Sequence, residues 1–179
     1  MRAISRLTAL LAAVCLCAVS CNNPYEDFKI HTGLTQEDLA IGVSFDFPMD
    51  SLLTYTTAVA ARLDISDGSK SALDLRFNII NPSFESFEET VSFPIVTGRS
   101  QVGCNPAKLG IRSRRAGQLL DQQWGWRKDI SCDTVPGRWR VIIFPADSTD
   151  ARIIKALGFT YKGIGTNAND SRMYQINEE

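Results

Sequence analysis

The residue whose surroundings most clearly predict a chemical modification is Cys21. It follows Ala18-Val19-Ser20, and small residues before a cysteine are typical of a lipobox, in which the thiol is diacylated before cleavage leaves it as the new N-terminus. Arg2 and Arg6 form a basic start, and Leu7–Val19 is largely apolar. This run of 13 residues is too short for a membrane-spanning helix, which needs about 20, so it predicts a signal peptide. An ordinary signal peptide with an incidental cysteine is the alternative.

Two other cysteines remain in the mature chain. Cys15 and Cys17 leave with the signal, so Cys104 and Cys132 are the candidates for a disulfide. Disulfides persist outside the cytoplasm, and this bond would close a loop of about 29 residues and contribute roughly 3–4 kcal/mol to stability. Two free thiols are the alternative. No histidine lies at ligand spacing from this pair, so no metal site is predicted.

Groups for acid–base or nucleophilic catalysis are few. His31 is the single histidine, and no motif connects it to a serine, cysteine or carboxylate, so we expect an exposed imidazole. Glu85, Glu88 and Glu89 are clustered, and two acids that flank one bond are the requirement for glycoside hydrolysis. Clustered acids are more often a solvated face. The sequence therefore predicts a protein that is not an enzyme and uses no cofactor.

The tryptophans suggest a different kind of site. If their segment is extended, Trp124 and Trp126 lie on the same side of it. Their rings would then form a platform for a sugar, with Arg127 or Lys128 bonding its hydroxyl groups. The alternative is that both rings fill the core or cover its edge, because tryptophan is commonly mostly buried. Trp139 falls within an alternating apolar pattern and is predicted to be core.

Charge excludes one class of partner. Without the two signal-peptide arginines, 17 Lys and Arg stand against 20 Asp and Glu, and this acidic balance argues against nucleic-acid binding. The basic residues Arg112, Arg114 and Arg115 are expected on a solvated loop, with contact to anionic lipid or a partner protein as the alternative. No later apolar run is long enough to span a membrane, so lipid alone would attach the protein.

Strands are predicted from alternating apolar residues. Positions 41–47 alternate, and the odd positions of 53–65 form one apolar face over 13 residues, which is a strong signal for a half-buried strand. Alternation resumes over 73–79, after an Asp67-Gly68 pair that suits a tight turn. We therefore predict a β-hairpin over residues 53–80.

The rest of the chain contains fewer regular signals. Residues 99–117 are predicted to form a long loop, and Asp150 is expected to cap a short helix over 150–157. Three more strands are predicted at 91–95, 138–144 and 159–164.

These elements predict an all-β fold. We expect a jelly-roll-like antiparallel β-sandwich of about six to eight strands with at most one short helix. Its organisation would be a lipoprotein signal peptide at 1–20, a lipidated tether at 21–30, and a single domain at 31–179.

The order of several short motifs adds a family resemblance. The motifs are Phe45 and Phe47 after a lipobox cysteine and short tether, the strands through Tyr55 and Leu63 and through Leu73 and Phe77, Gly125-Trp126, Pro136–Trp139 and Leu157–Phe159. Over roughly residues 39–162 this series resembles the gliding-motility lipoproteins of the GldH type. The resemblance implies a small lipid-anchored β-sandwich that serves a surface-motility and secretion apparatus, and it supplies no catalytic residues.

The expected function is thus that of an accessory envelope lipoprotein that binds other proteins. The alternative is a surface lipoprotein that captures glycans through Trp124 and Trp126. Asn22 is not the aspartate that retains some lipoproteins in the inner membrane, so the outer membrane is favoured, with either face open.

Overall fold

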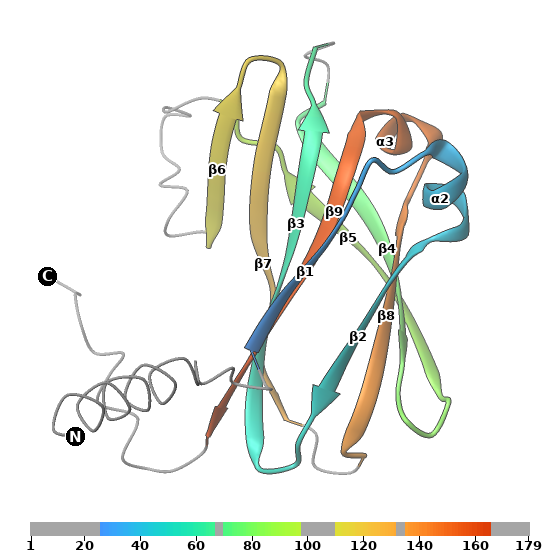
Figure 1. Cartoon of the computed structure of the whole chain (residues 1–179), viewed down its shortest axis with the longest axis vertical. Coiled ribbons are helices and arrows are strands. Elements are labelled where there is room, and N and C mark those ends of the chain that lie inside the picture. The colour runs from blue at the N-terminus through green and yellow to red at the C-terminus, as the bar shows by residue number, and fades with distance from the viewer. Residues whose placement is uncertain (1–25, 67–69, 98–109, 132–134, 166–179) are drawn as a thin grey trace, which may run out of the picture.

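The computed structural model describes residues 26–66, 70–97, 110–131 and 135–165, which form an antiparallel β-sandwich (Figure 1). Sheet A contains β1 (Glu26–Thr32), β9 (Ile154–Gly165), β3 (Leu53–Asp64), β7 (Leu119–Ser131) and β6 (Ile111–Ala116), in that order. Sheet B contains β2 (Val43–Met49), β8 (Gly137–Pro145), β4 (Ala72–Ile80) and β5 (Ser86–Pro94). Two short helices, α2 (Gln36–Ile41) and α3 (Ser148–Ile153), lie at one end. The predicted all-β fold is confirmed, with one more helix in these ranges than expected.

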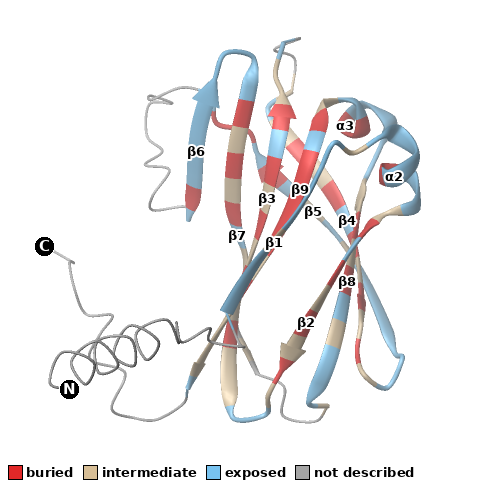
Figure 2. Cartoon of the chain, in the orientation of Figure 1, coloured by how far each residue is buried: buried red, intermediate tan, exposed pale blue. Residues whose placement is uncertain are grey.

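The core lies between the sheets because alternate side chains of each strand point inward (Figure 2). Phe45 and Phe47 on β2 pack against Phe159 on β9, with ring centroids 5.8 and 5.3 Å apart. Of the β3 residues that were predicted to form one face, Leu53 is partly buried and the others, among them Tyr55, Val59 and Leu63, are buried. Period-two alternation therefore identified the core face of this strand.

The predicted hairpin over 53–80 is wrong. β3 lies between β7 and β9 in sheet A, whereas β4 lies between β5 and β8 in sheet B, so the two strands do not pair. The chain leaves β3 with Ile65 N–H donating to the carbonyl of Gln118, and it approaches β4 with Ser71 accepting from Ile95. Alternation looks the same whether a strand pairs with its successor or faces it across the core.

Two edge strands replace segments predicted to be irregular. β6 occupies the end of the predicted 99–117 loop, and Gly117 (φ +64°) turns the chain from β6 into β7. β1 pairs with β9 along its whole length, so the sandwich begins at Glu26 and includes part of the predicted tether. Both strands are largely exposed, and an edge strand with little burial has a weak hydrophobic pattern.

The predicted helix over 150–157 is shorter and begins earlier. Asp147 is its N-cap, and its carboxylate accepts from Thr149 N–H and Asp150 N–H, both at 2.7 Å. The helix ends at Ile153 and strand β9 starts at Ile154. Isoleucine is β-branched, and β-branched side chains favour a strand over a helix. Asp150 is buried instead of capping, and it bonds to Lys70 Nζ at 2.5 Å.

Candidate functional site

Three residues predicted to carry chemistry lie outside the described residues. These are the acylation site Cys21 and the disulfide candidates Cys104 and Cys132. Within the described ranges no group of three or more His, Cys, Asp or Glu side chains is placed to hold a metal ion. In the same ranges no helix has the length and apolar character needed to cross a membrane.

Trp124 belongs to the core. Its side chain is 2% exposed, its Nε1 donates to the carbonyl of Pro94 at 2.8 Å, and its ring lies 5.3 Å from that of Phe93. A fully enclosed indole offers no face to a sugar, so the packing alternative holds for this residue.

Trp126 packs at the edge of the same core. Its ring stacks on Phe77 with centroids 4.4 Å apart and 16° between the planes. Its Nε1 donates to the Glu89 carboxylate at 2.8 Å. Arg127 forms an ion pair with the same carboxylate at 2.6 Å, and its guanidinium lies 5.3 Å from the indole centroid. The indole and Arg127 thus have partners within the chain, and no exposed two-tryptophan platform forms. Trp139 is also partly buried and donates to Val135.

The remaining polar candidates do not converge. His31 is exposed, as predicted, and meets the Phe45 ring edge-on at 5.1 Å. Glu85 bonds to Asn81, whereas Glu89 bonds to Trp126, so the acidic cluster is divided between separate partners.

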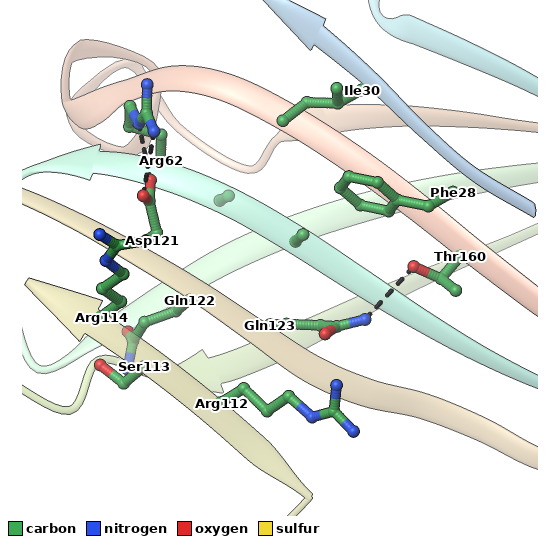
Figure 3. Close-up of a pocket in the computed structure, with 12 residues that line it drawn as sticks. Phe28, Ile30, Arg62, Arg112, Ser113, Arg114, Asp121, Gln122, Gln123 and Thr160 are labelled. Carbon is green, nitrogen blue, oxygen red and sulfur yellow. Dashed lines mark hydrogen bonds and ion pairs between the residues drawn. The ribbon is translucent and has the colours of Figure 1, made fainter.

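A concave surface lies elsewhere, on the outer face of sheet A (Figure 3). We call it the outer groove, and its volume is about 560 Å³. Its lining side chains come from all five strands of the sheet: Phe28 and Ile30 (β1), Thr160 (β9), Ala60 and Arg62 (β3), Asp121 and Gln123 (β7), Arg112 and Arg114 (β6).

The floor of the groove is low because small residues occupy the outward positions of the central strands. Val59 and Ala61 on β3 point into the core, so Ala60 between them points out. Gly158 on β9 lies beside Phe28, and a Cβ at that position would come within 3.0 Å of the Phe28 ring. Gly125 on β7 adds no side chain either.

The two long walls differ in character, as Figure 3 shows. Phe28 is 51% exposed and Ile30 is 48% exposed, which makes one wall apolar. Arg112 and Arg114 form the opposite wall on the edge strand β6. Neither arginine makes an ion pair or a side-chain hydrogen bond with another residue in the described part of the chain.

An ion pair closes one end of the groove. Arg62 donates to both carboxylate oxygens of Asp121, at 2.6 and 3.0 Å. This hydrogen bonding, with the nearby charges of Arg62 and Arg114, lowers the pKa of Asp121 from 3.8 despite its partial burial. Gln123 donates to the Thr160 hydroxyl at 3.3 Å across the floor. The lining holds three guanidinium groups against one carboxylate, so the groove is electropositive.

Sequence reasoning missed this site for a specific reason. The arginines were assigned to a solvated loop, and Phe28 and Ile30 were assigned to the tether. The alternation of Phe28 and Ile30 with Lys29 and His31 was a strand signal that could have revealed the apolar wall.

The fold and the groove together define a small antiparallel β-sandwich with an open groove lined by basic and apolar side chains. The chain matches no protein-family model, and a search of curated proteins finds none similar to it.

Proposed function

We propose that this protein is a lipid-anchored, non-enzymatic protein of the cell envelope that binds another protein through the outer groove. The observation that carries the proposal is the pairing of two exposed apolar side chains with two arginines that make no ion pair or side-chain hydrogen bond with another described residue. The export signal and Cys21 support attachment to a membrane. The motif order over residues 39–162 supports a role as an accessory component of a gliding-motility or secretion-type machine.

The chemistry of the groove favours an acidic, extended segment of the partner protein. Arg112 and Arg114 suit carboxylates, because guanidinium groups form charge-assisted and often bidentate hydrogen bonds with them. Phe28 and Ile30 suit an apolar side chain beside those carboxylates, since binding would remove both from water. A segment with alternating acidic and apolar residues would satisfy both walls.

The lipid anchor would make even a weak contact effective. Confinement of both partners to one membrane converts their encounter into a nearly intramolecular event, which raises the effective concentration. The outer membrane is the favoured location, and a partner in or on the same membrane is therefore expected.

Photo-crosslinking from the groove tests the contact. A benzophenone amino acid replaces Phe28 in the acylated full chain, and in a matched control it replaces Phe87, whose exposure is similar at 53%. A protein adduct from position 28 that is lost in R112Q/R114Q supports the proposal. An adduct pattern that is the same at both positions, or no protein adduct at position 28, contradicts it.

Metabolic labelling with a clickable fatty acid tests the anchor. The wild-type protein should carry the label, and Cys21→Ser should lose it. Label that persists in the serine variant would refute acylation at this position.

A further inference from the structure

The connection between β4 and β5 holds a phenylalanine out in solvent. Phe84 is 90% exposed, and its φ of 65° lies in the left-handed region that a residue with a Cβ adopts at a cost. Asn81, itself only 4% exposed, organises the loop. Its carbonyl accepts from Phe84 N–H at 3.0 Å, and its side chain bonds both Glu85 N–H and the Glu85 carboxylate. A strained residue held by an ordered loop points to a contact outside the chain.

A second exposed apolar side chain lies at the same end of the sandwich. Leu52, in the β2–β3 turn, is 73% exposed, and Asp50 holds this turn by accepting from Leu52 N–H at 2.8 Å. The two connections are neighbours because Pro82 packs on Gly137, which pairs with Met49 at the end of β2. Figure 1 shows both connections at the end of the molecule opposite α2 and α3.

The start of the domain lies close to this end. Glu26 pairs with Lys162, which pairs with Thr56, three residues from Leu53 at the beginning of β3. Three residues of strand are about 10 Å long. The five residues from Cys21 to Glu26 reach at most about 18 Å. Cys21 therefore lies within that distance of Glu26, and its acyl chain can reach a bilayer at this end of the domain.

We propose that this end of the sandwich, formed by residues 50–52 and 81–85, docks on the lipid bilayer with Phe84 and Leu52 in the interfacial layer. The inference rests on the acylation of Cys21 in the proposed function. Apolar side chains bind the headgroup–acyl boundary. The exposed Arg138 pairs with Pro48, and the exposed Lys128 lies in the part of β7 that pairs with the start of β3, so both are near this end and favour anionic headgroups.

The opposite end is less suited to a bilayer. It carries Ile41, which is 71% exposed, but α2 has Glu37 and Asp38 in its first turn and α3 is capped by Asp147. Carboxylates repel anionic headgroups and are costly to desolvate. The docking end also carries two, Asp50 and Glu85, but each is hydrogen-bonded within its own loop, and the tether from Cys21 begins near this end. Docking through the Phe84 end also leaves the outer groove open, since Ala60 on its floor lies four residues, about 13 Å, beyond Thr56 along β3.

Depth-dependent quenching in vesicles tests the proposal. The acylated full chain is reconstituted into phosphatidylcholine–phosphatidylglycerol vesicles, with and without bromine on the lipid acyl chains. Phe84→Trp reports on the docking end, and Ile41→Trp, at a residue of comparable exposure, reports on the opposite end. The emission added by Trp at 84 should be blue-shifted and quenched roughly twofold by brominated lipid, and that added at 41 should be unchanged. Leu52→Trp is a second reporter of the docking end should Phe84→Trp fold poorly.

Flotation of the vesicles separates this proposal from the one on which it rests. A protein that does not float with the vesicles lacks the anchor, and the proposed function then fails. A protein that floats, yet shows no quenching at 84 or 52, overturns the docking proposal alone. Equal quenching at 41 also overturns it, because the domain would then have no fixed orientation.

Discussion

The ring of Phe28 lies directly beside Gly158, where a Cβ would meet its Cε2 at 3.0 Å and the carbonyl oxygen of Lys29 at 3.2 Å. This one contact fixes two features of the outer groove. It lets the edge strand β1 approach β9 closely, and it sets the half-exposed phenyl ring at the margin of the groove floor. The groove therefore depends on a missing side chain as much as on those present.

Gly158→Ala should accordingly destabilise the protein and disturb the groove. The added methyl group must displace the Phe28 ring or the β1 backbone, and overpacking of this kind costs about 1–3 kcal/mol. Gly125→Ala on β7 is the matched control, because nothing lies within 4 Å of its Cβ position. Urea unfolding of both variants measures the difference. Equal stability of the two would show that Phe28 moves freely and that Gly158 does not shape this wall.

Trp126 should contribute to stability rather than form a sugar platform. Trp126→Ala removes the stack on Phe77 and the bond to Glu89, and we expect a loss of about 2–4 kcal/mol in unfolding free energy. Trp126→Phe keeps an aromatic ring against Phe77 and should lose less, about 1–2 kcal/mol, because the hydrogen bond to Glu89 and only part of the indole packing disappear. Calorimetry with a polysaccharide panel supplies the second readout. Unchanged stability together with lost glycan binding in the alanine variant would favour the glycan-capture alternative.

The Lys70–Asp150 pair should be the ion pair that matters most for folding. Asp150 is fully buried, which raises its pKa above 3.8 although the Lys70 hydrogen bond and charge oppose this. Lys70→Met leaves the carboxylate unpaired and should lower the unfolding free energy by about 2–4 kcal/mol. Asp150→Asn in the same chain should restore part of the loss, because it removes the buried charge.

Lys155→Met provides the comparison for that pair. Lys155 lies 3.8 Å from Asp64, and both side chains are substantially exposed, so no measurable change is expected. A loss equal to that of Lys70→Met would mean that removal of a lysine, and not burial of its partner, is responsible.

Acid should weaken the protein through two arginine-bound carboxylates. Hydrogen bonds from Arg140 and Arg62 lower the pKa values of Asp46 and Asp121 from 3.8. The unfolded chain therefore binds protons first as pH falls, so this stabilisation is complete above about pH 5 and is lost as pH drops below 3.8 through the folded-state pKa values. Unfolding in urea between about pH 7 and pH 2.5 should show a shallower acid slope in R62Q/R140Q than in the wild type. Asp150, whose pKa is raised, contributes to the pH dependence of stability with the opposite sign, but equally in both proteins. Parallel curves for the two proteins would therefore contradict the prediction.

How far the sequence predicted this fold depends on burial of each strand. β3 and β4 bury alternate side chains almost completely, so Leu63 and Phe77 could be assigned to a core face from the pattern. The strands that pair with β3 and β4 could not be predicted, because facing strands of a sandwich and paired strands of a hairpin have the same alternation. The short helix α2 depends on a capping box between Thr35 and Asp38 and has too few turns for a periodic signal.

One wall of the outer groove had a local strand signal, but the groove as a whole could not be predicted from local patterns. Phe28 and Arg112 belong to the two edge strands of sheet A, and only the strand order places them across one floor. Each looks ordinary alone, as an exposed aromatic near the N-terminus and an arginine in a polar stretch. The tryptophans show the converse, since Trp124 has a conspicuous residue type and yet fills the core.

Substitution of Phe84, the strained residue in the β4–β5 connection, should affect stability and bilayer contact in opposite directions. Phe84→Gly removes a Cβ from a left-handed backbone and a side chain that is 90% exposed, so the folded state loses almost no packing. The relief of about 1–2 kcal/mol exceeds the entropy that glycine adds to the unfolded chain, and a net gain of about 0.5–1 kcal/mol is expected in urea unfolding. Phe87→Gly on β5 is the control and should be destabilising, because Phe87 has ordinary strand geometry and glycine weakens a strand. A loss of stability in Phe84→Gly would show that the phenyl ring supports the fold. A gain, together with weaker bilayer contact in the quenching experiment measured through Leu52→Trp, would mean that the protein retains a destabilising residue for the surface it touches.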